Sequence, residues 1–210
     1  MNEERRRRSI RLKGYNYSQP GAYFITICTH DRECLFGAIF GGEMQLNDWG
    51  VITERCWTEI PSHFPNVALD AFVVMPNHVH GIIVIRKRNA PVGARHAVPL
   101  QSTGIFQTCI EQFGRPVSGS IPTIIRSFKA AVTRQINELR GTPGVPIWQR
   151  NYYEHVIRDE ESLDRIREYV AGNPAQWDQD SENPANVRAV QQGYGMPFHR
   201  TIQRGGTSLL

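Results

Sequence analysis

Residues 71–85, AFVVMPNHVHGIIVI, constrain the fold more than any other part of the chain. Two apolar runs flank a polar break at residues 76–78, and the second run opens with His78 and His80. Side chains two apart on a strand point to the same face, so these two imidazoles are expected to stand side by side. Apolar residues continue on both faces after them, which predicts a central strand that is buried on both sides.

The two histidines need partners, because burying an unsatisfied polar group is costly. A metal ion is one such partner, and a local hydrogen-bond network is another. Two histidines separated by one residue occur in metal sites, in phosphodiesterases and in ordinary cores. The pair alone therefore does not decide between these interpretations.

The composition indicates one globular domain with appendages. The chain has 210 residues, of which 40% are hydrophobic and 21% charged, which excludes an intrinsically disordered protein. It has no apolar run of membrane-spanning length and no signal-peptide core, which predicts a cytoplasmic protein without a membrane partner. The cysteines show no CxxC pairing and are interpreted as free thiols rather than a zinc site; they are Cys28, Cys34, Cys56 and Cys109.

Residues 1–19 form a predicted basic N-terminal arm. The formal net charge is +4, and six of the 24 lysines and arginines lie close together in this arm. One interpretation is a solubilising tail, and the other is contact with phosphates, since cations gain free energy by releasing counterions from a polyanion. Tyr15 and Tyr17 can stack on bases or pack on the domain edge. The cations of the arm are Arg5, Arg6, Arg7, Arg8, Arg11 and Lys13.

The remaining pattern predicts an α+β fold. Strands are expected at residues 22–29, 67–75, 78–85 and 148–157, a hairpin at 35–46, and helices at 48–60, 120–139 and 159–172. Asn47 or Asp48 is expected to cap the first helix, and Asp159 the last. This order is typical of a ferredoxin-like sandwich, with a central antiparallel β-sheet and packed α-helices.

Three boundaries follow from the same pattern. The main domain is expected to span residues 20–177, with an inserted loop at 86–118 that is rich in proline, glycine and arginine. Residues 178–210 are polar and glycine-rich, and we expect a poorly ordered C-terminal tail.

The last predicted helix carries a second candidate group. Residues four apart share a helical face, so Tyr169 and Asn173 are expected to point into one site. For Tyr169 the alternative is a half-buried aromatic side chain with a wet hydroxyl. For Asn173 the alternative is helix termination, which Gly172 favours.

The segments MPNHVHGIIVI, IPTIIRSFKAAVTRQIN and IWQRNYYEHVIRDEESLDRIREYVAGNPAQW resemble the single-tyrosine transposases of the HUH (His-hydrophobic-His) nuclease superfamily. The REP-associated tyrosine transposases are the branch that they resemble, and the opening RSIRLKGYNYSQPGAYFITICT is similar to that branch too. The resemblance runs from about residue 8 to residue 177. Its specific part is the HxH motif followed by YxxxNP in this order of elements.

The resemblance implies a chemistry for the candidate residues. His78, His80 and Asn173 would hold a divalent metal ion. Tyr169 would attack a phosphodiester of single-stranded DNA, become linked to the 5′ phosphate and release a 3′ hydroxyl. Imidazole ligands suit Mn²⁺, and Mg²⁺ is the abundant alternative.

The resemblance also implies the partner, which is an imperfect DNA hairpin whose stem the basic arm would grip. Both a homodimer that exchanges catalytic helices and a monomer stay open, and the expected location is the nucleoid of a bacterial cytoplasm. One alternative function is a non-cleaving regulator that binds DNA hairpins. Another is a phosphodiesterase, although such enzymes usually carry two HxH motifs and this chain has one.

Overall fold

The computed structural model describes residues 15–87 and 117–186. The cations predicted for the basic arm, most of the inserted loop and the end of the tail lie outside these ranges. Within them, no helix combines the length and the hydropathy that crossing a membrane requires.

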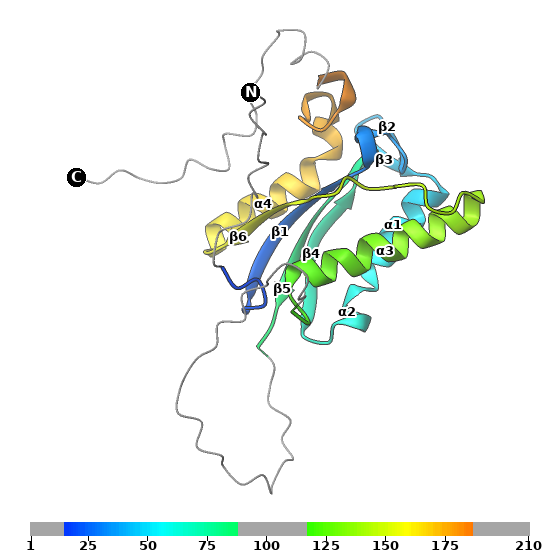
Figure 1. Ribbon diagram of the computed structural model, residues 1–210. Coiled ribbons are helices and arrows are strands. Elements are labelled where there is room, and N and C mark those ends of the chain that lie inside the picture. The colour runs from blue at the N-terminus through cyan, green and yellow to red at the C-terminus, as the bar shows by residue number, and fades with distance from the viewer. Residues whose placement is uncertain (1–14, 88–116, 187–210) are drawn as a thin grey trace, which may run out of the picture.

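Four strands form one antiparallel sheet in the order β4-β5-β1-β6. They are β1 (Gly21–Cys28), β4 (Val67–Val74), β5 (His78–Ile85) and β6 (Tyr153–Ile157). Helix α1 (Asp48–Thr58) connects β1 to β4, and α3 (Ile121–Arg140) connects β5 to β6 (Figure 1). This βαββαβ order confirms the predicted ferredoxin-like α+β sandwich.

The shorter elements follow local signals in the sequence. Strands β2 (Gly37–Phe40) and β3 (Glu43–Leu46) make the predicted hairpin, whose two turn glycines both have positive φ. Asn47 caps α1 by accepting hydrogen bonds from two backbone amides. The first predicted helix is divided, because a second helix, α2 (Ile60–His63), begins beyond Thr58 with a proline in its first turn.

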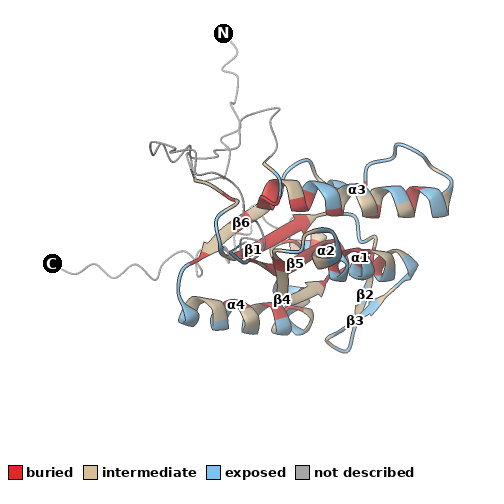
Figure 2. Cartoon of the chain, turned by 90° about the horizontal axis from the view of Figure 1, so that it is seen from below, coloured by how far each residue is buried: buried red, intermediate tan, exposed pale blue. Residues whose placement is uncertain are grey.

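The two faces of the sheet bury different clusters. Helices α1 and α3 pack on the face that carries Val79 and Ile83. Helix α4 (Glu160–Gly172) packs on the opposite face, over Ile82 and Val84. Figure 2 shows the strands between α3 and α4. Strand β5 is therefore buried on both sides, as predicted, and its histidines lie on the α4 face.

The strand predicted at residues 148–157 is wrong in its first half. Trp148 makes only an isolated bridge with Thr29, and β6 begins at Tyr153. Between them, the ammonium of Lys129 donates to the carbonyls of residues 149 and 151, at 2.8 and 2.9 Å. These carbonyls turn to α3 instead of joining the sheet. Trp148 itself is a core residue.

The prediction of a poorly ordered tail from residue 178 is wrong over residues 178–186. The chain leaves α4 through a 3-10 helix, η2 (Pro174–Gln179), and then buries Asp180, Glu182 and Asn183. Asn183 accepts from the amide of Ala185, a capping bond that stabilises the next turn. The segment therefore belongs to the domain.

Candidate active site

Asn77 fixes the tautomer of His78. The Asn77 amide nitrogen donates to the backbone carbonyls of Arg32, at 3.1 Å, and Glu182, at 2.7 Å, which sets the orientation of the amide. Its oxygen therefore faces Nδ1 of His78 at 2.8 Å, and that nitrogen carries the proton. The neutral ring then presents an unprotonated Nε2, the form that binds a metal.

His80 lies beside His78, with 4.4 Å between the ring centroids. Thr26 is opposite His80 in the register of β1 and β5, and its hydroxyl lies 2.8 Å from Nδ1. Phe24 stacks on the His80 ring with centroids 5.4 Å apart. On the other side of the ring, Nε2 lies 3.2 Å from the hydroxyl of Tyr169. Nδ1 of each imidazole is thus engaged within the sheet or its adjoining turn.

Helix α4 brings Tyr169 and Asn173 to the histidines. Asp159 caps the helix by accepting from the amide of Ser162 at 2.8 Å, as predicted. Asn173 has helical φ and ψ of −60° and −41°, so Gly172 does not turn the chain away. Tyr169 and Asn173 therefore share one helical face, four residues apart, and that face looks onto β5.

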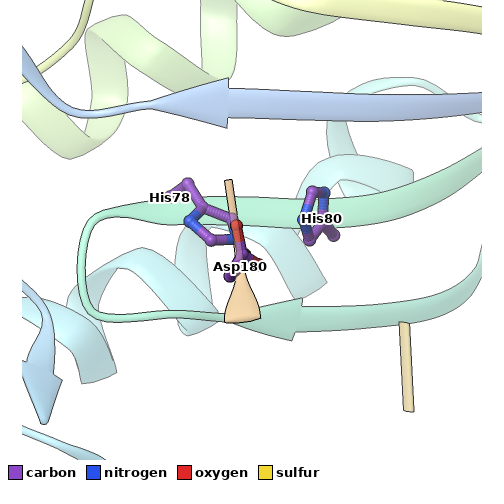
Figure 3. A group of neighbouring side chains, drawn as sticks. All are labelled: His78, His80 and Asp180. Atoms are coloured by element: carbon purple, nitrogen blue, oxygen red, sulfur yellow. The ribbon is translucent and has the colours of Figure 1, made fainter. Parts of the chain in front are cut away.

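Asp180 completes the cluster from the segment after η2, as Figure 3 shows. Its Oδ2 accepts from the amide nitrogen of Asn173 at 3.0 Å and lies 3.8 Å from Nε2 of His78. Its Oδ1 accepts from the backbone amide of Glu182 at 2.6 Å, a local turn that holds the carboxylate in place. The candidate ligand atoms of His78, His80 and Asp180 all lie within 4.8 Å of one another.

The buried polar atoms of this cluster fit a divalent metal ion. In the described part of the chain, Nε2 of His78 and the amide oxygen of Asn173 are among the buried side-chain atoms without a hydrogen-bond partner, and they are the two that lie in this cluster. Such orphaned atoms are rare in native structures and call for a ligand or an ion. Two imidazole nitrogens, a carboxylate and an amide oxygen form a donor set suited to Mn²⁺ or Mg²⁺.

Burial and nearby charges set the protonation of the site. Burial lowers the pKa of His78 to about 4, although the charge of Glu182 and the amide of Asn173 oppose this shift. Burial also raises the pKa of the Tyr169 phenol, and the carboxylates of Asp180 and Glu182 add to the rise. His78 is therefore neutral at pH 7 and Tyr169 is protonated.

An ion pair lies at the outer edge of the cluster, and we call Arg32 and Glu182 the rim pair. A guanidinium nitrogen of Arg32 lies 2.6 Å from Oε2 of Glu182 and donates to the carbonyl of Ser181 at 3.2 Å. The thiol of Cys28 donates to the same Glu182 oxygen at 3.1 Å. Cys28 is the register partner of His78, so the rim pair adjoins the His78 end of the site.

Most of the predicted site residues come together. The structure brings His78, His80, Tyr169 and Asn173 to one place within a single chain. The cations predicted to bind DNA lie outside the described residues. Of the two neighbouring tyrosines, Tyr17 is buried against Tyr23 and so packs on the domain.

Sequence reasoning missed Asp180, Glu182 and Arg32. The acidic residues belong to a polar stretch, QDSENPAN, whose composition indicates a turn and has no periodicity. Arg32 stands in a short connection between β1 and the hairpin. None of the three is spaced like the histidines or the tyrosine, so no local signal marks them.

Comparison with known proteins identifies relatives along most of the chain. No protein-family model matches it. An uncharacterized protein of Haemophilus influenzae is 49% identical over 177 residues, which are 83% of this chain and 91% of that protein. The two chains belong to one family. A second Haemophilus influenzae protein, named "Putative REP-associated tyrosine transposase", is 24% identical over 188 residues, or 90% of this chain and 85% of that protein.

Among solved structures, a REP-associated tyrosine transposase bound to a REP hairpin aligns with a TM-score of 0.46 and 18% identity. The alignment covers 98% of this chain and 87% of that one.

Proposed function

We propose, since this chain belongs to the REP-associated branch of the HUH tyrosine transposases, that it cleaves and rejoins single-stranded hairpin DNA through a phosphotyrosine intermediate. One observation carries the proposal. The phenol of Tyr169 lies 3.2 Å from Nε2 of His80, in a site where another imidazole nitrogen and an amide oxygen are buried without partners. This arrangement joins a nucleophile to a set of metal ligands, as covalent catalysis of this kind requires.

The residues that would hold the metal are His78, His80, Asp180 and Asn173. A divalent cation there would act as a Lewis acid on the scissile phosphate and offset the carboxylate charge that raises the Tyr169 pKa. Asp180 is a change from the ligand set that the sequence implied, in which Asn173 alone completed the histidine pair. Asn173 would position Asp180 through their hydrogen bond and offer its own oxygen as well.

The chemical step is a transesterification. The Tyr169 oxygen bonds to phosphorus, and the bond from phosphorus to the 3′ oxygen of the preceding nucleotide breaks. The phenol loses one proton and the departing oxygen gains one, so the products are a 5′ phosphotyrosine and a 3′ hydroxyl. A 3′ hydroxyl of another strand end reverses the step without a nucleotide cofactor.

Helix α4 packs on the sheet of its own chain, so one chain by itself brings the candidate residues together. We therefore favour a monomer as the active form. The basic arm, which includes Arg5 and Arg11, would grip the phosphates of the hairpin stem without reading its sequence. The protein would then act on chromosomal DNA in the bacterial nucleoid.

Mass spectrometry after incubation with Mn²⁺ and a pool of single-stranded hairpin oligonucleotides tests this function. We expect a peptide containing Tyr169 that carries a 5′-phosphorylated fragment, together with a shortened strand ending in a 3′ hydroxyl. Hairpin binding without any covalent product would instead support the non-cleaving regulator. Cleavage that does not depend on metal and forms no adduct would support a phosphodiesterase.

A further inference from the structure

The candidate metal ligands are closed off from solvent. The exposed fraction of His78 is 0%, that of His80 is 3%, that of Asn173 is 2% and that of Asp180 is 8%. A phosphodiester is a large, charged group that has to reach these atoms. A side chain at the edge of the cluster must therefore give way to it.

The rim pair is a polar contact at that edge. The side chain of Arg32 is 32% exposed and that of Glu182 is 12% exposed, whereas the side chains of His78 and Asp180 are 0% and 3% exposed. The carboxylate of Glu182 contacts the cation of Arg32 and the thiol of Cys28. The guanidinium of Arg32, which adjoins the site, is therefore already paired with a carboxylate.

The backbone around Arg32 is held in an unusual conformation. Asp31 and Arg32 have φ of 50° and 59°, and no other non-glycine residue in the described ranges has positive φ. Such strain persists where the surroundings enforce it, and it clusters at functional sites. Here Asn77, which also fixes the tautomer of His78, donates to the carbonyl of Arg32. One amide thus couples the position of Arg32 to that of a candidate metal ligand.

We infer that Arg32 is a phosphate-binding residue of this site, and that the carboxylate of Glu182 occupies its guanidinium until a DNA phosphate displaces it. Guanidinium groups pair with carboxylates and with phosphates through the same donors, so one anion can replace the other. The two anions cannot share the place, because like charges at contact distance repel strongly. The inference rests on the proposed function and adds a binding residue and an internal competitor to it.

The test is a double-mutant cycle on Glu182→Gln and Arg32→Gln, read by the Kd for the hairpin pool in the presence of Mn²⁺. Glu182→Gln removes the competing charge, so we expect hairpin binding to tighten by about fivefold to tenfold. Arg32→Gln removes the phosphate partner and should weaken binding by about tenfold or more. In the double variant the gain from Glu182→Gln should vanish, since no guanidinium remains to be released.

Matched controls come from an exposed ion pair on α4. Glu161 and Arg165 lie 2.7 Å apart, four residues apart on the helix and remote from the rim pair in the chain. Glu161→Gln and Arg165→Gln change the net charge by the same amounts and should alter the Kd by less than about twofold. Calorimetric titration with Mn²⁺ and the unfolding midpoint of each variant show whether the site and the fold stay intact. If Glu182→Gln fails to fold, Glu182→Ala and Arg32→Lys repeat the cycle.

Two outcomes overturn the inference. One is unchanged or weaker hairpin binding by a folded Glu182→Gln protein that still binds Mn²⁺. The other is tightening that persists in the double variant or appears equally in Glu161→Gln. Either result leaves the proposed function standing if the wild-type protein forms the Tyr169 adduct. Lack of that adduct in the wild type counts against the function itself.

Discussion

The phenol oxygen of Tyr169 lies 3.2 Å from Nε2 of His80, although the two residues are 89 positions apart in the chain. Their rings pack edge to face, with centroids 5.2 Å apart. The strand and the helix that carry the two residues are thus fixed against each other at the point where the chemistry would occur.

Replacing the nucleophile should separate cleavage from binding. Tyr169→Phe removes the attacking oxygen and keeps the ring, so we expect no covalent adduct, and a hairpin Kd within about threefold of the wild type. The fold should lose no more than about 1 kcal/mol, the usual contribution of one hydrogen bond. Tyr153→Phe, a change on the same face of the sheet, is the control and should keep full adduct formation. An adduct with Tyr169→Phe would refute the nucleophile.

Asp180 should contribute to metal affinity. Asp180→Asn removes a buried negative ligand, and we expect Mn²⁺ binding to weaken by about tenfold or more in calorimetric titrations. Asp178→Asn is the matched control, because Asp178 is exposed and stands only two residues away. Equal Mn²⁺ affinity in the two variants would indicate that Asp180 is not a ligand and that Asn173 alone completes the histidine pair.

Arg167 should position the tyrosine helix. Arg167 stands on α4 two residues before Tyr169. Its guanidinium donates two hydrogen bonds to the carboxylate of Asp70 on β4, at 2.9 and 2.8 Å. Lysine keeps the charge but cannot make both bonds, so Arg167→Lys should slow adduct formation by about threefold to tenfold with little change in hairpin Kd. The exposed Arg165→Lys should leave the rate unchanged. If both variants react at the wild-type rate, the ion pair between Arg167 and Asp70 does not position the tyrosine helix.

Gly81 should be intolerant of any side chain. A Cβ at this position of β5 would lie 2.3 Å from Cζ2 of Trp57, whose indole fills the space above the strand. Gly81→Ala must displace that ring and should lower the free energy of unfolding by about 1–3 kcal/mol. Gly172→Ala, which meets nothing closer than 3.5 Å in α4, should be neutral or stabilising. Urea unfolding compares the two, and equal stabilities would contradict the close approach.

Acid should destabilise the fold through His78. Its pKa is lowered from 6.5 to about 4, so between these values the unfolded chain binds a proton that the folded chain does not. Above about pH 6.5, His78 is neutral in both states and does not lower the free energy of unfolding. As the pH drops from 6.5 toward 4, proton uptake by the unfolded chain lowers the free energy of unfolding by roughly 3 kcal/mol in all. Urea unfolding across this range should show a smaller slope for His78→Gln than for the wild type. His63→Gln, at an exposed position, should keep the wild-type slope.

The sequence alone was sufficient for the features that depend on neighbouring residues. Alternating apolar residues predicted β5 with His78 and His80 on one face, and the spacing of α4 placed Tyr169 and Asn173 together. Capping by Asn47 and Asp159 was predicted for the same reason, because a cap bonds to amides two or three residues away.

Only the tertiary structure decided what meets across long distances. The packing of α4 on the histidine face, the hydrogen bond between Thr26 and His80, and the approach of Asp180 and the rim pair depend on sheet register and on the path of the chain after α4. A buried carboxylate in a polar turn has no periodicity, since its burial is set by distant residues that fold over it. The residues after Trp177 therefore resemble a disordered tail in sequence, yet they contribute Asp180 to the candidate site.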